Sequence, residues 1–197
     1  RRLHAFQQAG HQAVLIIGDY TAQVGDPSGR DKSRAALSAE QTKRFASTYL
    51  EQVGHTIDLK KTEVRYNSEW FNRFTAADFL KLTMAVSANT ILKHDTFRQR
   101  LDRGLPLGMH ELLYPLLQGY DSVAVEADIE LGGNDQKFSL LTGRDVQAAY
   151  GLERQDIILF DYLVGTDGKE KMSKTAGNTI AIEESANEMY GKVMSIP

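Results

Sequence analysis

The feature that most constrains the fold is an apolar run, residues 13–17 (Ala-Val-Leu-Ile-Ile), that lies between Gly10 and Gly18. A run that is apolar at every position, and not only at alternate positions, is typical of a strand buried on both faces of a parallel sheet. Parallel strands need long crossover connections, which are usually helical. The run therefore predicts that strands and helices alternate along the chain.

The rest of the chain supports this alternation. Further strands are predicted at residues 64–66, 129–131 and 157–160, and helices at 38–54, from 75 onward, over 90–103, over 109–125, over 134–150 and over 183–194. Asn134 is a candidate cap, and the stretch 90–103, which includes Arg100, reads as a charged and exposed helix. We predict an α/β fold, a Rossmann-type parallel sheet with helices on both faces.

Composition excludes several classes of protein. The 197 residues are 42% hydrophobic, enough for one buried domain, yet they contain no apolar run long enough for a transmembrane helix. The absence of cysteine excludes disulfides and thiolate metal sites, and the five histidines have no metal-ligand spacing. A net charge of -3 argues against a basic nucleic-acid-binding domain.

Three polar, glycine-containing segments follow predicted strands, at residues 19–34, 132–136 and 166–175. Ligands of parallel α/β sheets bind outside the carboxyl ends of the strands, so these segments predict one shared binding site. The alternative is that they are ordinary surface loops, which are commonly polar and rich in glycine.

The third segment carries a lysine loop, Glu170-Lys-Met-Ser-Lys-Thr-Ala176, with glycines on both sides. Two ammonium groups three positions apart, Lys171 and Lys174, suit a triphosphate whose negative charge builds up during reaction. A short run of this kind is also common in solvated loops.

The first segment contains a Gly-Asp-Pro-Ser-Gly-Arg turn that presents the carboxylate of Asp26, followed by Arg30 and Arg34. It can hold an ammonium group beside a phosphate, or it can be an ordinary Asp-Pro turn. It lacks the phosphate-binding P-loop pattern. In the second segment, Gly132 and Gly133 allow close backbone approach of a ligand, and Asp135 could accept from ribose hydroxyls.

Tyr114, Gln118 and Asp121 lie at positions i, i+4 and i+7 of the helix predicted over 109–125. A phenol, an amide and a carboxylate therefore share one stripe among apolar neighbours and need polar partners. A hydrogen-bonded core network and a polar ligand would both satisfy them.

Together these segments resemble the bacterial-type tyrosyl-tRNA synthetases, which are class I aminoacyl-tRNA synthetases with a Rossmann-type catalytic domain. The resemblance rests on residues 8–11, 25–30, 66–70, 114–121, 132–136 and 171–175.

The resemblance implies a role for each matching residue. For tyrosine, it implies that Asp26, Tyr114 and Gln118 hold the ammonium group with Thr21 close by, that Asp121 accepts the phenolic O–H, and that Gln136 lies near the carboxyl group. For ATP, it implies that Gly133 and Asp135 bind the ribose, and that Lys171, Lys174 and Thr175, helped by Arg30 and Arg34, act on the departing pyrophosphate.

The implied reaction joins tyrosine to ATP as tyrosyl-adenylate and then transfers the tyrosyl group to tRNA(Tyr). The resemblance also implies Mg²⁺ together with ATP, no tightly bound cofactor, a cytoplasmic homodimer and no membrane. Two alternatives stay open, the related tryptophanyl-tRNA synthetase and a non-catalytic tyrosine- or RNA-binding paralogue. Asp121 favours tyrosine over tryptophan, because a carboxylate suits a phenol better than an indole.

The sequence departs from the family pattern at both ends. It has no His-x-Gly-His signature, and we expect that the first strand of the sheet, which carries it, is missing. We also expect residues 1–197 to be a partial catalytic domain without an anticodon-binding region, and to be inactive alone. Glu130 stands where some relatives have Gln, and its role is open.

Overall fold

The computed structural model describes residues 2–24, 39–173 and 176–196. Several residues that the sequence singled out lie outside the described residues, namely Asp26, Arg30, Arg34, Lys174 and Thr175. The chain divides into two compact units, residues 1–158 and residues 159–197.

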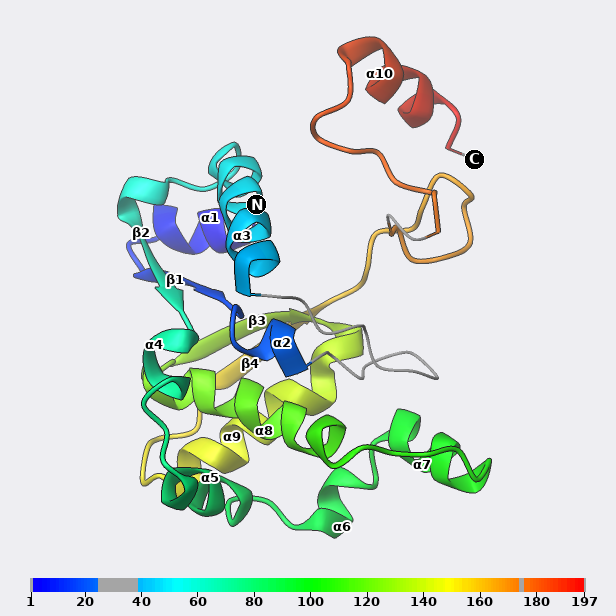
Figure 1. The fold of residues 1–197 in the computed structure, drawn as a ribbon. Helices are drawn as coiled ribbons and strands as arrows, with labels where there is room; N and C mark the ends of the chain where they lie inside the picture. The colour runs from blue at the N-terminus through cyan, green and yellow to red at the C-terminus, as the bar shows by residue number, and fades with distance from the viewer. Residues whose placement is uncertain (1, 25–38, 174–175, 197) are drawn as a thin grey trace. The chain divides into compact units, whose positions relative to one another are not determined.

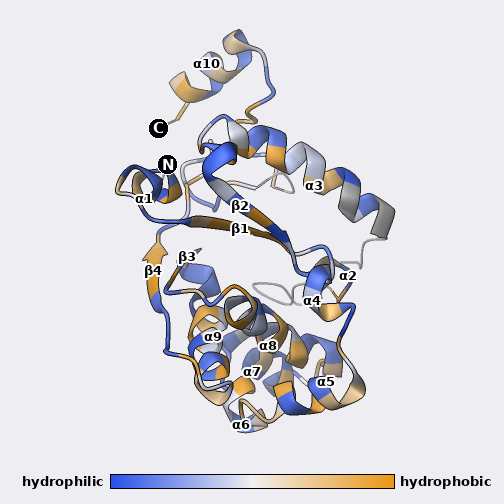
Figure 2. Cartoon of the chain, turned by 90° about the vertical axis from the view of Figure 1, so that its left-hand side faces the viewer, coloured by the Kyte–Doolittle hydropathy of each residue, from blue (hydrophilic) through white to orange (hydrophobic). Residues whose placement is uncertain are grey.

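A pair of parallel strands lies near the start of the first unit (Figure 1). Strand β1 (Ala13–Ile17) pairs with β2 (Thr62–Tyr66) along its whole length. Figure 2 shows that β1 is hydrophobic throughout, as the glycine-bounded run predicts. The parallel pairing confirms the crossover that this run requires.

Helices surround and connect the two strands. Helix α1 (Arg2–Gln8) precedes β1, and the crossover contains α2 (Thr21–Val24), α3 (Ala39–Gly54) and a 3₁₀ turn, η1 (Leu59–Lys61). The side-chain amide of Gln7 donates to Thr62 Oγ1 at 2.8 Å, which joins α1 to the beginning of β2.

The main core of the first unit lies among its helices. These are α4 (Ser68–Phe71), α5 (Ala76–Thr83), α6 (Ala88–Ile91), α7 (Asp95–Asp102), α8 (Met109–Ala124) and α9 (Lys137–Ala149). Their buried side chains form one cluster: Phe71, Leu82, Ile91, Phe97, Leu116, Leu117 and Val146. Helices α8 and α9 approach closely because two glycines meet, and a Cβ on Gly119 would lie 3.1 Å from the Gly143 Cα.

A second strand pair follows. Strand β3 (Ile129–Gly133) pairs with β4 (Asp156–Phe160), and a 3₁₀ turn, η2 (Asn134–Gln136), joins β3 to α9. All four predicted strands are therefore present. Asn134 does not cap the helix, because η2 comes between it and α9, whose N-cap is Gln136.

Two further expectations are corrected. The segment after β1, expected to be a loop because of its glycines and proline, contains one turn of helix, α2. The charged stretch 90–103 is not exposed throughout, because Arg100 is 5% exposed and donates to Glu111 Oε1 at 2.7 Å. A buried guanidinium is tolerated here because it is paired with a carboxylate.

The second unit contains a turn-rich segment and the final helix, α10 (Ala186–Met194). A capping box between Ser185 and Glu188 begins this helix. Lys192 donates to Glu184 Oε1 at 2.5 Å and to the Thr179 carbonyl at 3.2 Å, so the helix is fastened to the segment that precedes it.

Candidate functional site

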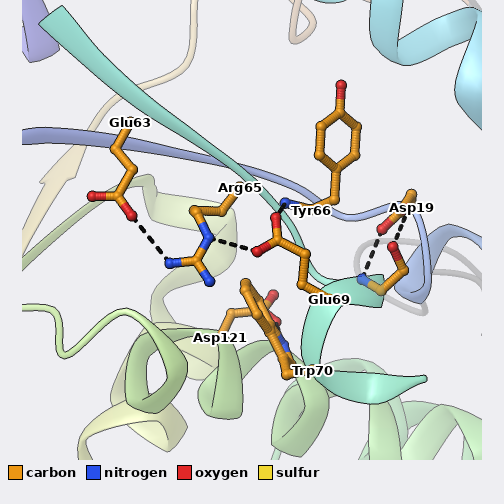
Figure 3. Close-up of polar contacts among 8 residues, drawn as sticks. Asp19, Glu63, Arg65, Tyr66, Glu69, Trp70 and Asp121 are labelled. Atoms are coloured by element: carbon orange, nitrogen blue, oxygen red, sulfur yellow. Dashed lines mark hydrogen bonds and ion pairs between the residues drawn. The ribbon is translucent and has the colours of Figure 1, made fainter. Parts of the chain in front are cut away.

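The carboxylate of Asp121, on α8, is the centre of a polar cluster at the carboxyl ends of β1 and β2. Trp70 Nε1 donates to Asp121 Oδ1 at 3.0 Å, and Asn67 Nδ2 donates to Asp121 Oδ2 at 3.3 Å. Figure 3 shows the Trp70 ring beside Asp121, with the polar residues that end β2 above them. The two donors fix the direction of the carboxylate.

Asn67 is fully buried, and its side-chain amide and its backbone N–H together link three elements. Its Oδ1 accepts from the Tyr20 N–H at 2.8 Å, and its Nδ2 donates to Thr21 Oγ1 at 3.0 Å as well as to Asp121. The Asn67 N–H donates to the Ile17 carbonyl at 3.0 Å. This asparagine therefore joins the end of β1, helix α2 and helix α8.

The indole of Trp70 is contacted on its ring face by Arg65, in addition to the hydrogen bond that its N–H makes to Asp121. The Arg65 guanidinium carbon lies 5.6 Å from the centre of the Trp70 ring, within cation–π range. Arg65 itself is held by Glu69 at 2.7 Å and Glu63 at 3.0 Å (Figure 3). These contacts restrict the indole to one orientation, with its N–H directed at Asp121.

Asp121 is unusual in its acidity. Burial raises its pKa to about 7, partly opposed by the hydrogen bonds from Asn67 and Trp70, while the nearby charges of Glu130 and Asp19 raise it further. A desolvated carboxylate with fixed donors on both oxygens is a common property of recognition and catalytic sites.

Gln118 lies one helical turn before Asp121 on the same side of α8. Burial raises the pKa of Glu130 on β3, and Gln118 is among the neighbouring side chains that partly oppose this rise. Tyr114 lies one further turn back and is half-buried. Helix α8 thus places the three polar residues of the predicted stripe along one side, as their spacing indicates.

The segment after β3 contains the other described candidates. Gly133 is extended (φ -76°, ψ 157°) and leads into η2, which contains Asp135 and Gln136. Asp135 is exposed and Gln136 is half-buried. The neighbouring Gly132 has a packing role, because a Cβ there would lie 2.8 Å from Leu140 Cδ2.

In the second unit, the side chains of Asn178 and Asp167 hydrogen-bond each other and backbone groups of the described residues around Lys171. Asn178 is 4% exposed, accepts from the Ser173 N–H at 2.8 Å and donates to Asp167 Oδ2 at 2.6 Å. Asp167 also accepts from the backbone N–H groups of Lys169 and Glu170, both at 2.9 Å. Lys171 is exposed and pairs with Val164 in an isolated antiparallel β-bridge.

Asn67 and Trp70 had no individually predicted role, and the role of Glu130 was open. Asn67 and Trp70 lie in the Tyr-Asn-Ser-Glu-Trp run directly after β2, so their position at a strand end was a usable signal. Their partner Asp121 is more than 50 residues away, and no local pattern connects them.

Comparison with known proteins places this arrangement in a family. Residues 1–197 match the family described as tRNA synthetases class I (W and Y). The chain belongs to this family. The resemblance that the sequence motifs indicated is thereby confirmed.

Named relatives of this family align with the whole chain. The tyrosine–tRNA ligase of Dehalococcoides mccartyi (strain CBDB1) is 50% identical over 197 residues, which are 100% of this chain and 50% of the relative. That of Carboxydothermus hydrogenoformans is 49% identical over 197 residues, again 100% of this chain and 48% of the relative. The chain spans about half the length of the curated relatives it matches.

Solved structures of class I synthetases share the fold. The tyrosyl-tRNA synthetase of Archaeoglobus fulgidus, complexed with L-tyrosine, has a TM-score of 0.78 and 21% identity, and covers 100% of this chain and 58% of its own. A tryptophanyl-tRNA synthetase of Campylobacter jejuni has a TM-score of 0.70 and 21% identity, with 97% and 58% covered. The predicted α/β, Rossmann-type class is confirmed.

Proposed function

We propose that the protein containing these residues activates tyrosine with ATP and transfers the tyrosyl group to tRNA(Tyr), and that residues 1–197 alone do not suffice for it. The observation that carries this proposal is the Asp121 carboxylate, which Trp70 and Asn67 hold in a fixed direction. The half-length matches to tyrosine–tRNA ligases at about 50% identity support the same substrate.

Asp121 would recognise the phenolic hydroxyl of tyrosine. An ionised carboxylate can accept about four hydrogen bonds, and the donors from Trp70 and Asn67 use one on each oxygen. A further O–H donor can therefore be accepted, and hydrogen bonds to a charged group are stronger than neutral ones. Phenylalanine would leave this desolvated carboxylate without that donor.

The polar head of the amino acid would meet residues on the same helix and on neighbouring loops. In this proposal Gln118, Tyr114 and Asp26 bind the ammonium group, with Thr21 close by, and Gln136 lies near the carboxyl group. Support comes from α8, which places Gln118 one turn from Asp121 and Tyr114 one turn further.

The nucleotide would be handled by backbone and by cations. Gly133 and Asp135 would bind the ribose of ATP, as their place directly after β3 suggests. Lys171, Lys174 and Thr175, with Arg30 and Arg34, would stabilise the negative charge that develops on the pyrophosphate.

The chemistry needs no side-chain nucleophile. A carboxylate oxygen of tyrosine attacks the α-phosphorus of ATP, the bond to the bridging oxygen breaks, and pyrophosphate leaves with its electron pair. A ribose hydroxyl of the tRNA then attacks the carbonyl carbon, and AMP leaves. The protein contributes positioning and charge stabilisation.

We propose that Mg²⁺ enters bound to the phosphates of ATP. Within the described parts of the chain, no group of three or more His, Cys, Asp or Glu side chains could hold a metal ion. Mg²⁺ is commonly bound through substrate phosphates and only one or two carboxylates, so the described residues are compatible with this route.

We further propose that the enzyme is a cytoplasmic homodimer in which this segment is part of the catalytic domain. Two large apolar side chains at the end of α5 are strongly exposed, Leu80 at 66% and Met84 at 85%. Exposed apolar side chains of this size favour a surface that a second subunit covers. No helix among the residues that the structure describes is both long and apolar enough to cross a membrane.

The proposed function is tested by ATP–pyrophosphate exchange with the full-length protein, using tyrosine and tryptophan in parallel. We expect exchange with tyrosine and little with tryptophan. Exchange with tryptophan alone would favour the sister enzyme, and tyrosine binding without exchange would favour a non-catalytic paralogue.

A further inference from the structure

The turns that follow β1 and β2 bind each other through one polar side chain from each. Asp19, in the turn after β1, accepts from the Ser68 N–H at 2.9 Å through Oδ1 and from Ser68 Oγ at 2.6 Å through Oδ2 (Figure 3). In the opposite direction, Asn67 Oδ1, after β2, accepts from the Tyr20 N–H at 2.8 Å. Each turn therefore supplies a side chain to a backbone N–H of the other.

Asp19 supplies the hydrogen-bond acceptor that helix α4 needs at its start. A helix of a single turn is not stable by itself, and the first N–H groups of a helix need acceptors from outside its backbone ladder. The side chain of the N-cap residue commonly provides one. The N-cap residue of α4, Asn67, instead uses its amide for the Tyr20 N–H and for Asp121. The Ser68 N–H is bound by Asp19, so α4 is held in place from the end of a different strand.

The two donors to Asp121 lie on either side of the residue that Asp19 holds. Asn67 precedes Ser68 in the chain and donates to Asp121 Oδ2, and Trp70 follows two residues later and donates to Asp121 Oδ1. Hydrogen bonds weaken steeply when the donor turns away from the acceptor. A rotation of this one turn of helix would therefore misalign both donors at once.

We propose that Asp19 is a positioning residue for substrate selection, because its two bonds to Ser68 hold α4 where Trp70 and Asn67 orient the Asp121 carboxylate. This inference rests on the proposed function, in which Asp121 accepts the phenolic hydroxyl of tyrosine. Without Asp19 the carboxylate loses its fixed direction, and the phenolic hydroxyl loses an acceptor that is already in place. Phenylalanine has no hydroxyl and does not gain from that direction.

A purely structural role of Asp19 predicts a different outcome. If Asp19 only stabilises the fold, its loss lowers the amount of active protein and reduces kcat/KM for tyrosine and phenylalanine by the same factor. If it orients the donors to Asp121, kcat/KM falls for tyrosine alone. The tyrosine-to-phenylalanine ratio separates the two roles, because the amount of active protein cancels in it.

The test measures this ratio by pyrophosphate exchange in full-length Asp19→Ala and Asp19→Asn. The alanine variant removes both bonds to Ser68, and we expect the ratio to fall roughly tenfold. The asparagine variant keeps the shape, since its carbonyl oxygen can accept from the Ser68 N–H and its NH₂ group can donate to the hydroxyl oxygen. We expect it to restore the ratio to within about twofold of the wild type, because the position of α4 is kept.

Asp58→Ala is the matched control, because it removes the same kind of group from the opposite end of β2. Asp58 caps η1, directly before β2, and its Oδ1 accepts from the Lys60 N–H at 3.0 Å. We expect this variant to lower the midpoint of thermal unfolding and to leave the ratio unchanged. In a double-mutant cycle, adding Asp19→Ala to Asp121→Asn should change the ratio by less than about twofold, because Asp19 acts through that carboxylate.

If Asp19→Ala does not fold, Ser68→Ala decides the question, because it removes only the hydroxyl that donates to Asp19 and keeps the backbone bond. We expect the ratio to fall about threefold in that variant. Equal losses for the two amino acids, or a ratio in Asp19→Asn as low as in Asp19→Ala, would overturn the inference and leave the proposed function intact. A wild-type protein that does not prefer tyrosine to phenylalanine would contradict the proposed function, and this inference with it.

Discussion

The cluster around Asp121 and the lysine loop around Lys171 are stabilised in opposite ways. The first is built from contacts between residues far apart in sequence, with Asn67 and Trp70 reaching across more than 50 positions to α8. The second is built from contacts within residues 163–178, in which Asn178 and Asp167 hold backbone groups of the same loop.

This difference suits two different tasks. A group that selects a substrate in its ground state benefits from a fixed, desolvated position, because the tertiary structure has already oriented it. Cations that act on a charge present only during reaction can lie on a locally folded segment that moves as a unit. The comparison predicts that changes near Asp121 affect stability and tyrosine binding, whereas changes near Lys171 affect the rate of activation.

The largest expected effect on the Asp121 side is the loss of stability in Asn67→Ala. The substitution removes the partner of the Tyr20 N–H and the Asn67 donor to Asp121 Oδ2, and leaves the Asp121 carboxylate with Trp70 alone of the two donors. We expect the free energy of unfolding to fall by about 3 kcal/mol in urea denaturation. The exposed Asn72→Ala is the control, with an expected change below about 0.5 kcal/mol. Equal effects of the two substitutions would show that Asn67 does not hold the cluster.

On the other side of the comparison, Lys171→Ala should slow tyrosine activation. Loss of one stabilising group for a developing charge typically lowers kcat by a factor of about 100 or more. We expect that loss in pyrophosphate exchange with an unchanged Kd for tyrosine, and Lys169→Ala on the same loop as a near-neutral control. A raised Kd for tyrosine with an unchanged kcat would remove the distinction between the two regions.

The pH dependence of stability should report the burial of Asp121. Its pKa is about 7 in the folded protein, whereas the pKa of an ordinary aspartate is 3.8, so the native state keeps a proton that the unfolded chain releases between about pH 4 and 7. The contribution of Asp121 to stability is therefore full at low pH and is lost as pH rises to about 7. From pH 5 to 8, the unfolding free energy of the wild type should fall by roughly 2 kcal/mol relative to Asp121→Asn.

Urea denaturation of the two proteins at several pH values measures this difference directly. A difference that is constant between pH 5 and 8 would mean that the Asp121 carboxylate is as well solvated as an ordinary one.

A smaller effect is expected from Trp70→Phe, which keeps an aromatic ring but removes the N–H that directs Asp121 Oδ1. We expect the Kd of tyrosine to rise roughly tenfold, because the carboxylate loses its orientation. The KM for ATP should stay the same in exchange assays. A matching rise in the KM for ATP would mean that the indole supports the whole fold and not the carboxylate in particular.

Local patterns predicted most of the elements. The apolar run 13–17 became β1, and the stripe of Tyr114, Gln118 and Asp121 lies along one side of α8, because both depend on side-chain periodicity alone. Arg100 was misjudged because its charge suggested solvent, whereas its partner Glu111 lies on the following helix.

The surroundings of the site could not be predicted in the same way. The bonds of Asp121 to Asn67 and Trp70, and those of Glu130 to Ser122 and Gln155, exist only when β2, α8, β3 and the segment before β4 are packed together. Long-range pairs of this kind leave no periodic signal in the sequence. The roles of Asp26, Arg30, Arg34, Lys174 and Thr175 stay predictions.

The central claim is that Asp121 selects the substrate through its phenolic hydroxyl. It is tested most directly by measuring kcat/KM for tyrosine and for phenylalanine in wild-type and Asp121→Asn full-length protein. We expect the tyrosine-to-phenylalanine ratio to fall by about tenfold to a hundredfold in the variant, with the loss confined to tyrosine. An unchanged ratio, or an equal loss for both amino acids, would contradict the claim.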